Sequence, residues 1–226
     1  MNSRKYAVTA GILFIIGTAA GILSVAISGS IIDAPDYLSK MGAHQVLITF
    51  SALLVFIMGA ACAGTTIAMY PVLKRSYPAL AIGSAGFRLI EGTLAAICCV
   101  FILCILSLSR EFIKNGADVA NYQITGLILM AGRHFSSIAM LFAWCIAAFM
   151  YYSVFYQTKL IPRWLSGWGI IGIVLAVTAN TLDLFNIVSA FSPVNGALNA
   201  PIAIQEMVMA AWMIAKGFNL PAEGKD

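Results

Sequence analysis

The most constraining feature of this sequence is the stretch of residues 78–108, which is almost wholly apolar and yet contains an arginine. About 30 residues of helix, at about 1.5 Å per residue, are long enough to cross the ~30 Å hydrocarbon core of a bilayer. Arg88 stands about ten residues into this stretch, which puts it near the bilayer midplane. An arginine at that depth costs about 2.5–3.5 kcal/mol on insertion scales and needs a compensating partner. Glu91 is three residues further along the same helical face, within reach for an ion pair.

The composition of the chain is that of a membrane protein. Of its 226 residues, 61% are hydrophobic and 10% are charged, and the mean hydropathy is +0.93, whereas about 25% of a soluble domain is charged. Six apolar stretches are long enough to span a bilayer, at about residues 6–28, 44–73, 78–108, 135–156, 167–187 and 197–217. We predict an all-α polytopic membrane helix bundle with six transmembrane helices. Residues 1–218 would form one transmembrane domain and residues 219–226 a short cytoplasmic tail.

The distribution of basic residues predicts the orientation of the bundle. Eight of the 13 lysines and arginines fall at the two termini and in the second and fourth connections: Arg4, Lys5, Lys74, Arg75, Lys159, Arg163, Lys216 and Lys225. Only Lys40, Arg110 and Lys114 fall in the first and third connections. Because basic residues accumulate on the cytoplasmic side of membrane proteins, we expect both termini in the cytoplasm. The net charge of +4 is therefore a topology signal, and we expect no nucleic-acid partner.

Two polar segments are expected on the outer side. Residues 29–43 contain an Ala-Pro-Asp-Tyr-Leu sequence that is typical of a short interfacial turn. Residues 109–122 form the most polar connection and are expected to be an external surface loop. Arg133 and His134 interrupt the apolar run at the start of the fourth helix. We place both near the outer interface, where the arginine can reach water or point into the bundle.

Polar and ionisable residues within the predicted helices form a candidate site. The cluster comprises Arg88, Glu91, Arg133, His134, Asn180, Asp183, Gln205 and Glu206. Helix rise places Asp183 and Glu206 in the outer part of the last two helices, so we expect them to face each other across a water-accessible mouth. Arg88 and Glu91 would form the floor of this vestibule. Such a cluster is consistent with binding or moving a small solute or protons, or with a structural or accessory protein whose charges only hold the bundle together.

Enzymatic and cofactor-dependent functions are less well supported by the sequence. Residues 167–172 match the dinucleotide-binding pattern G-x-G-x-x-G, but they open a membrane span and follow no strand. His44 and His134 make a haem between helices conceivable, although nothing else in the sequence supports one. A serine next to His134, with Asp183 as the acid, lacks the Gly-x-Ser-x-Gly elbow of a hydrolase. The five cysteines form no spaced pair typical of a metal site. We therefore expect no cofactor and no metal, and an enzyme is the less favoured alternative because no catalytic motif is recognisable.

Four short motifs carry a resemblance to a known family. They are Tyr-Pro-Val-Leu-Lys at 70–74, Gly-Phe-Arg-Leu-Ile-Glu at 86–91, Ile-Pro-Arg-Trp-Leu at 161–165, and Pro-Ile-Ala-Ile-Gln-Glu at 201–206 followed by Trp212 and Lys-Gly-Phe at 216–218. Their order and spacing resemble the bacterial domain-of-unknown-function family 4386 over about residues 7–218. The resemblance implies a six-helix protein of the bacterial cytoplasmic membrane with no assigned activity. It carries over no catalytic residues, and it leaves homo-oligomers open.

Overall fold

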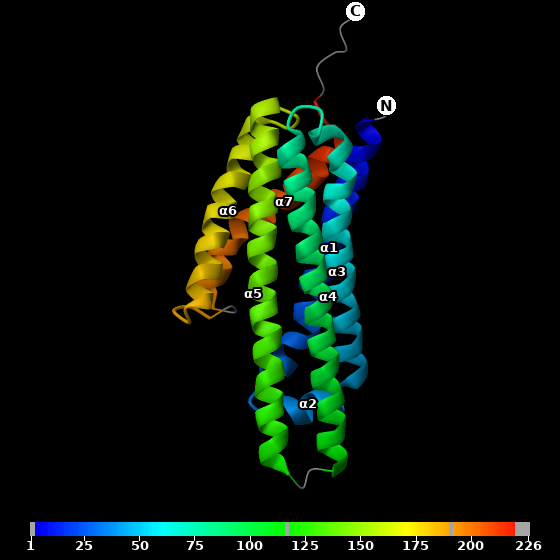
Figure 1. Cartoon of the computed structure of the whole chain (residues 1–226), viewed down its shortest axis with the longest axis vertical. Helices are drawn as coiled ribbons and strands as arrows, with labels where there is room; N and C mark the ends of the chain where they lie inside the picture. Colours follow the sequence, from blue (N-terminus) through cyan, green and yellow to red (C-terminus); the bar gives the residue numbers. More distant parts are fainter. Residues whose placement is uncertain (1–2, 116–117, 190–191, 220–226) are drawn as a thin grey trace, which may run out of the picture.

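The computed structural model describes residues 3–115, 118–189 and 192–219, and in these ranges it contains seven α-helices and no strand. They are α1 (Ser3–Ile32), α2 (Tyr37–Ala43), α3 (Gln45–Leu73), α4 (Pro78–Asn115), α5 (Val119–Thr158), α6 (Arg163–Leu184) and α7 (Pro193–Ala215) (Figure 1). Every helix except α2 is long and apolar enough to cross a membrane. The predicted all-α polytopic bundle with six spanning helices is therefore confirmed.

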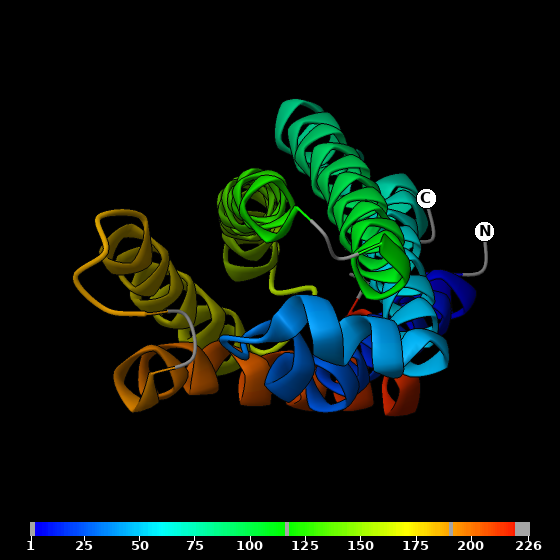
Figure 2. The same ribbon diagram turned by 90° about the horizontal axis from the view of Figure 1, so that it is seen from below.

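The six long helices are arranged in a closed ring. Each of them packs chiefly on two others, in the order α1, α3, α4, α5, α6, α7 and back to α1 (Figure 2). The short helix α2 packs on α4 at one end of this ring. Side chains that point toward the ring axis can therefore meet even when they come from helices that are far apart in the sequence.

The two ends of the ring differ in charge. The start of α1, the α3–α4 turn, the α5–α6 turn and the end of α7 lie at one end (Figure 1), which we call the basic end. Its lysines and arginines are Arg4, Lys5, Lys74, Arg75, Lys159, Arg163 and Lys216. We call the opposite end, where α2 lies, the distal end. The expectation that the basic end faces the cytoplasm stays a prediction.

The predicted tail over residues 219–226 lies almost wholly outside the described residues. Its first residue, Asn219, is described, and its backbone N–H donates to the carbonyl oxygen of Leu160 at 2.8 Å. The end of the chain after α7 is thereby tied to the α5–α6 turn at the basic end.

The expected surface loop over residues 109–122 is wrong. α4 continues to Asn115 and α5 begins at Val119, which leaves only residues 116–118 between them. The two helices have 38 and 40 residues, or about 57 and 60 Å at the usual rise. They extend together beyond α6 and α7 at the distal end (Figure 1).

The polarity of this segment reflects an exposed helix surface and not a loop. Lys114 Nζ lies 3.6 Å from Glu111 Oε1, one helical turn away, and Asn115 donates to the same Glu111 carboxylate at 3.2 Å. The side chain of Asp118 accepts a hydrogen bond from the backbone N–H of Asn121 and so caps the start of α5. These local contacts stabilise the polar ends of two helices. A drop in hydrophobicity along the sequence is the same for such helix ends and for a loop, so it does not distinguish them.

Glycines allow a close helix approach in the ring between α3 and α4. A Cβ atom added to Gly92 would lie 2.9 Å from the carbonyl oxygen of Gly59, whereas one added to Gly86 meets nothing within 4 Å. The backbones of α3 and α4 can therefore touch at Gly92, as small residues allow in membrane proteins.

We expect Gly92→Ala to destabilise the protein by about 1–3 kcal/mol, because the added methyl group must push a backbone carbonyl aside. The matched control is Gly86→Ala in the same helix, which should be neutral or stabilising by up to about 1 kcal/mol because alanine favours helix. Thermal unfolding in detergent measures both. Equal effects of the two substitutions would contradict the close contact.

The topology itself is testable with reporter fusions. Three spans, α5, α6 and α7, separate the α4–α5 connection from the end of the chain. A reporter after the last residue and one inserted between α4 and α5 should therefore report opposite sides of the membrane, with the C-terminal reporter in the cytoplasm. A result in which both reporters lie on one side would contradict the six-span arrangement.

Candidate functional site

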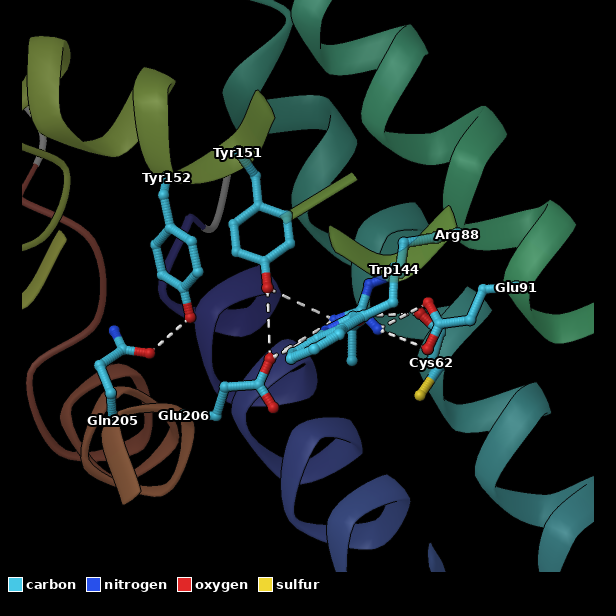
Figure 3. A network of polar contacts seen from close by, with 9 residues as sticks. Cys62, Arg88, Glu91, Trp144, Tyr151, Tyr152, Gln205 and Glu206 are labelled. Carbon is cyan, nitrogen blue, oxygen red and sulfur yellow. Dashed lines mark hydrogen bonds and ion pairs between the residues drawn. The ribbon is translucent and has the colours of Figure 1, made fainter. Parts of the chain in front are cut away.

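A buried charge network lies inside the ring in its basic half. Arg88 on α4 is 1% exposed, and its Nη1 donates to both carboxylate oxygens of Glu91, at 3.1 and 2.9 Å (Figure 3). This is the ion pair that the sequence predicts. Nη2 of Arg88 lies 3.9 Å from Oε1 of Glu206 on α7. One guanidinium therefore faces two carboxylates from two helices.

Aromatic side chains from α5 complete this network. The hydroxyl of Tyr151 accepts from Arg88 at 3.5 Å and donates to Glu206 Oε1 at 3.4 Å, and Trp144 Nε1 donates to the same oxygen at 3.3 Å. The Arg88 guanidinium also lies over the rings of Phe14 on α1 and Tyr151, at 5.5 and 5.7 Å. Four helices of the ring, α1, α4, α5 and α7, thus meet at one arginine.

A second polar connection lies beside the network and closes the ring on the α6 side. Tyr152 donates to Gln205 Oε1, and Gln205 Nε2 donates to the carbonyl oxygen of Leu165 at 2.9 Å. Tyr151, Tyr152, Gln205 and Leu165 are all 0% exposed. We call these contacts, together with those of Arg88, the inner network. The basic half of the ring is closed by packed side chains.

The distal half of the ring is hollow instead. A cavity of about 410 Å³ lies between α1, α3, α4, α5, α6 and α7. Eight polar side chains line it: Ser24, Ser28, Arg133, Ser137, Asn180, Asp183, Asn195 and Asn199. The rest of the lining is largely apolar and includes Met58, Ile102 and Leu141. We call this cavity the distal chamber.

A second hollow of about 460 Å³ adjoins the chamber between α5 and the α6–α7 connection. Asp33, His134 and Asn186 are among its lining residues. Arg133 and Asp183 line both the hollow and the chamber. These two side chains therefore mark the place where the chamber can open toward the distal end.

Arg133 is paired with Asp33 at this opening. Its Nη2 lies 3.7 Å from Asp33 Oδ1, which connects α5 to the α1–α2 connection. Burial raises the pKa of Asp33 above its ordinary value, and the Arg133 guanidinium opposes that shift. The pair is partly exposed, so its contribution to stability is small.

The family assignment follows from a comparison over nearly the whole chain. The family described as Domain of unknown function (DUF4386) matches residues 9–217. The chain belongs to this family. No curated protein and no solved structure matches it. DUF4386 membership confirms the resemblance drawn from the four motifs, and the six long apolar helices make this a multi-pass membrane protein.

The structure separates the candidate residues of this DUF4386 protein into two groups. Arg88, Glu91, Gln205 and Glu206 belong to the inner network, whereas Arg133, His134, Asn180 and Asp183 line the distal chamber or the hollow. The sequence predicts a single vestibule, but these residues lie in two separate regions. The inner network is closely packed, and the distal chamber is open.

The expected placement of Glu206 opposite Asp183 is wrong. α7 begins at Pro193 rather than near Ala197, so Glu206 lies about 20 Å along the helix, past its midpoint. It pairs with Arg88 instead. Arg133 and His134 also do not interrupt α5, which is continuous from Val119 to Thr158.

Several polar partners were not identified from the sequence. Trp144 and Tyr151 are seven residues apart on α5, and seven residues are close to two helical turns, so both point at Glu206. Asn195 and Asn199 are four residues apart on α7, and the Asn199 amide donates to Asn195 Oδ1 at 2.8 Å. For both pairs, the spacing of the two residues along one helical face is the sequence feature that could have identified them.

The described part of the chain lacks the side-chain clusters that bind metal ions. Those residues contain no group of three or more histidine, cysteine, aspartate or glutamate side chains that could hold a metal ion. The histidines lie apart in the chain, with His44 at the α2–α3 junction and His134 on α5.

The inner network predicts strong coupling between Arg88 and Glu91. Arg88→Met and Glu91→Gln should each destabilise the protein by about 3–5 kcal/mol, because each strands a buried charge. The double variant should lose less than the sum. The matched control is the exposed pair Glu111 and Lys114, which has the same spacing in the same helix. Its removal should cost less than about 1 kcal/mol. Thermal unfolding in detergent measures all of these variants, and additive losses at Arg88 and Glu91 would contradict the pairing.

Proposed function

We propose that this membrane protein binds a small amphipathic solute in the distal chamber, and that the solute enters from the distal end. The observation that carries this proposal is the chamber itself. It is a partly open space within the helix ring, and eight polar side chains line it among apolar ones. A bundle held only by packing has no need of such a lining, because polar groups at membrane depth are costly.

The size and lining of the chamber favour one class of ligand. Its volume of about 410 Å³ falls within the usual range of about 300–1,000 Å³ for small-molecule sites. The asparagine and serine side chains offer both donors and acceptors, and the apolar residues offer a surface for a hydrocarbon part. A solute with a polar group and a short apolar chain fits this combination.

Access from only one end supports binding over free conduction. The basic half of the ring is filled by side chains that are fully buried, including Tyr151, Tyr152 and Leu165. A solute in the chamber would have to displace the inner network to reach the basic end. In this conformation the inner network separates the chamber from the basic end.

The alternative function, a purely structural or accessory protein, is favoured by the inner network. That network is closely packed, and Arg88 is 1% exposed. We assign the structural role to the inner network and the binding role to the chamber, so that the two interpretations apply to different halves of one bundle.

Single cysteines test whether the chamber opens as proposed. In a background without the five native cysteines, Asn180→Cys and Asn199→Cys should react with a small membrane-impermeant methanethiosulfonate. Reaction should occur from the distal side and not from the basic side of oriented vesicles. Asp36→Cys in the exposed α1–α2 connection is the positive control, and Ser84→Cys, at a position that is 0% exposed, is the negative control.

Occupation of the chamber is then measured as slower labelling. A small amphipath such as n-hexylammonium or 1-hexanol should slow the reaction at Asn180→Cys and leave Asp36→Cys unchanged. If neither chamber position reacts from the distal side while Asp36→Cys does, or if neither amphipath slows the reaction, the proposed function is wrong.

A further inference from the structure

We infer that the solute of the distal chamber carries a cationic, ammonium-type group that pairs with Asp183. This inference rests on the proposed function and names the class of its ligand. It is carried by the carboxylate of Asp183, by the charge balance around it and by the neighbouring amide groups.

Asp183 is an acidic side chain that has no partner in the described part of the chain. It is 7% exposed and lines the chamber close to the end of α6. Among the described residues, no hydrogen-bond donor or basic side chain contacts its carboxylate within bonding distance. A mostly buried carboxylate that faces a cavity is only partly hydrated, and a bound cation offsets the cost of the lost hydration. The other charges of the candidate cluster lie next to an opposite charge, as the Arg88–Glu91 and Arg133–Asp33 pairs show.

The charge balance at the opening is negative. The hollow and the chamber are lined by one arginine and two aspartates: Arg133, Asp33 and Asp183. Arg133 lies 3.7 Å from Asp33, so these two charges offset each other and Asp183 is left over. With histidine counted as neutral, the lining carries one negative charge. An anionic solute would be repelled, and an uncharged one would leave the carboxylate unpaired.

The groups near Asp183 suit an ammonium ion. Asn180 precedes it by three residues on the same face of α6, and its amide nitrogen donates toward Cys145 Sγ at 3.9 Å. In the described part of the chain nothing donates to the side-chain oxygen, Oδ1, of Asn180. Carboxylate and amide oxygens are the acceptors that an ammonium group with several N–H donors needs. The apolar side of the chamber would hold the hydrocarbon part.

Two sources can supply this chemistry. One is a free primary amine, and the other is the headgroup of an aminophospholipid from the distal leaflet. Both present an ammonium group next to an apolar chain. Binding of n-hexylammonium in two lipid compositions separates them.

The test measures binding of three probes of equal chain length to the full-length protein in phosphatidylglycerol nanodiscs. The probes are n-hexylammonium, hexanoate and 1-hexanol, and titration calorimetry measures their affinities. We expect n-hexylammonium to bind at least about tenfold more tightly than the other two, because only it pairs with the buried carboxylate. Asp183→Asn should remove this preference. Asp36→Asn, which removes the same charge from an exposed site, should leave it intact.

A stability measurement gives a second readout that does not need the ligand. Because Asp183→Asn removes an unpaired buried charge, the ligand-free variant should unfold at a higher temperature than the native protein. A structural carboxylate would give the opposite result, a lower unfolding temperature. A lower unfolding temperature for Asp183→Asn, together with an unchanged preference for n-hexylammonium, overturns the inference.

The outcomes separate this inference from the proposed function. Binding of hexanoate or 1-hexanol as tightly as n-hexylammonium overturns the cationic ligand and leaves a solute chamber in place. Failure of all three probes also overturns it, and the cysteine labelling then decides whether the chamber is a binding site at all. In nanodiscs that contain phosphatidylethanolamine, weaker binding of n-hexylammonium would identify a lipid headgroup as the occupant. Unchanged binding would support a free amine.

Discussion

A positive charge buried inside the membrane-spanning ring is the constraint on which the arrangement of the helices depends. Arg88 is 1% exposed and lies about 15 Å from the start of α4. Its own helix supplies Glu91, but Glu91 alone leaves part of the guanidinium without partners. The remaining contacts come from Tyr151 on α5, Glu206 on α7 and Phe14 on α1. Any rearrangement of the ring order would leave a charge unpaired at membrane depth, which is costly. The network therefore specifies which helices are neighbours.

The same requirement explains why the two halves of the ring differ. In the basic half, the polar groups of the inner network bond to one another, except Nε of Arg88, and are surrounded by fully buried apolar side chains. In the distal half, the helices enclose polar groups that are only partly satisfied, and a cavity remains between them. A cavity lined by unsatisfied polar groups is stable when water or a solute fills it. Other protein groups thus complete most of the hydrogen bonding in the basic half, whereas water or a solute completes it in the distal half.

The sequence predicts the features of this structure that depend on a single segment, and it does not predict contacts between distant segments. Hydropathy identifies the six spans, and helical spacing identifies the Arg88–Glu91 pair, because both are properties of a single segment. The position of Glu206 depends on where α7 begins, and a shift of four residues in that start moves a side chain by about 6 Å. The polar hairpin of α4 and α5 was predicted as a loop, since its stabilising contacts between Glu111, Lys114 and Asn115 do not appear in a hydropathy pattern. The partners from other helices, such as Trp144 for Glu206, depend on the ring order, which no single segment contains.

The chamber and the inner network share their helices, and this limits how one can affect the other. α5 carries Arg133 in the chamber and Tyr151 in the network, and α7 carries Asn199 in the chamber and Glu206 in the network. The Arg88–Glu91 pair lies within α4 and keeps its geometry when helices shift as rigid bodies. The contacts of Glu206 join α7 to α4 and α5, and at 3.3–3.9 Å they are longer than the Arg88–Glu91 contacts at 2.9 and 3.1 Å. A small displacement of α7 by a solute bound beside Asn199 would lengthen these contacts first. Coupling between the distal chamber and the closed basic half would therefore pass through Glu206 rather than through the Arg88–Glu91 ion pair.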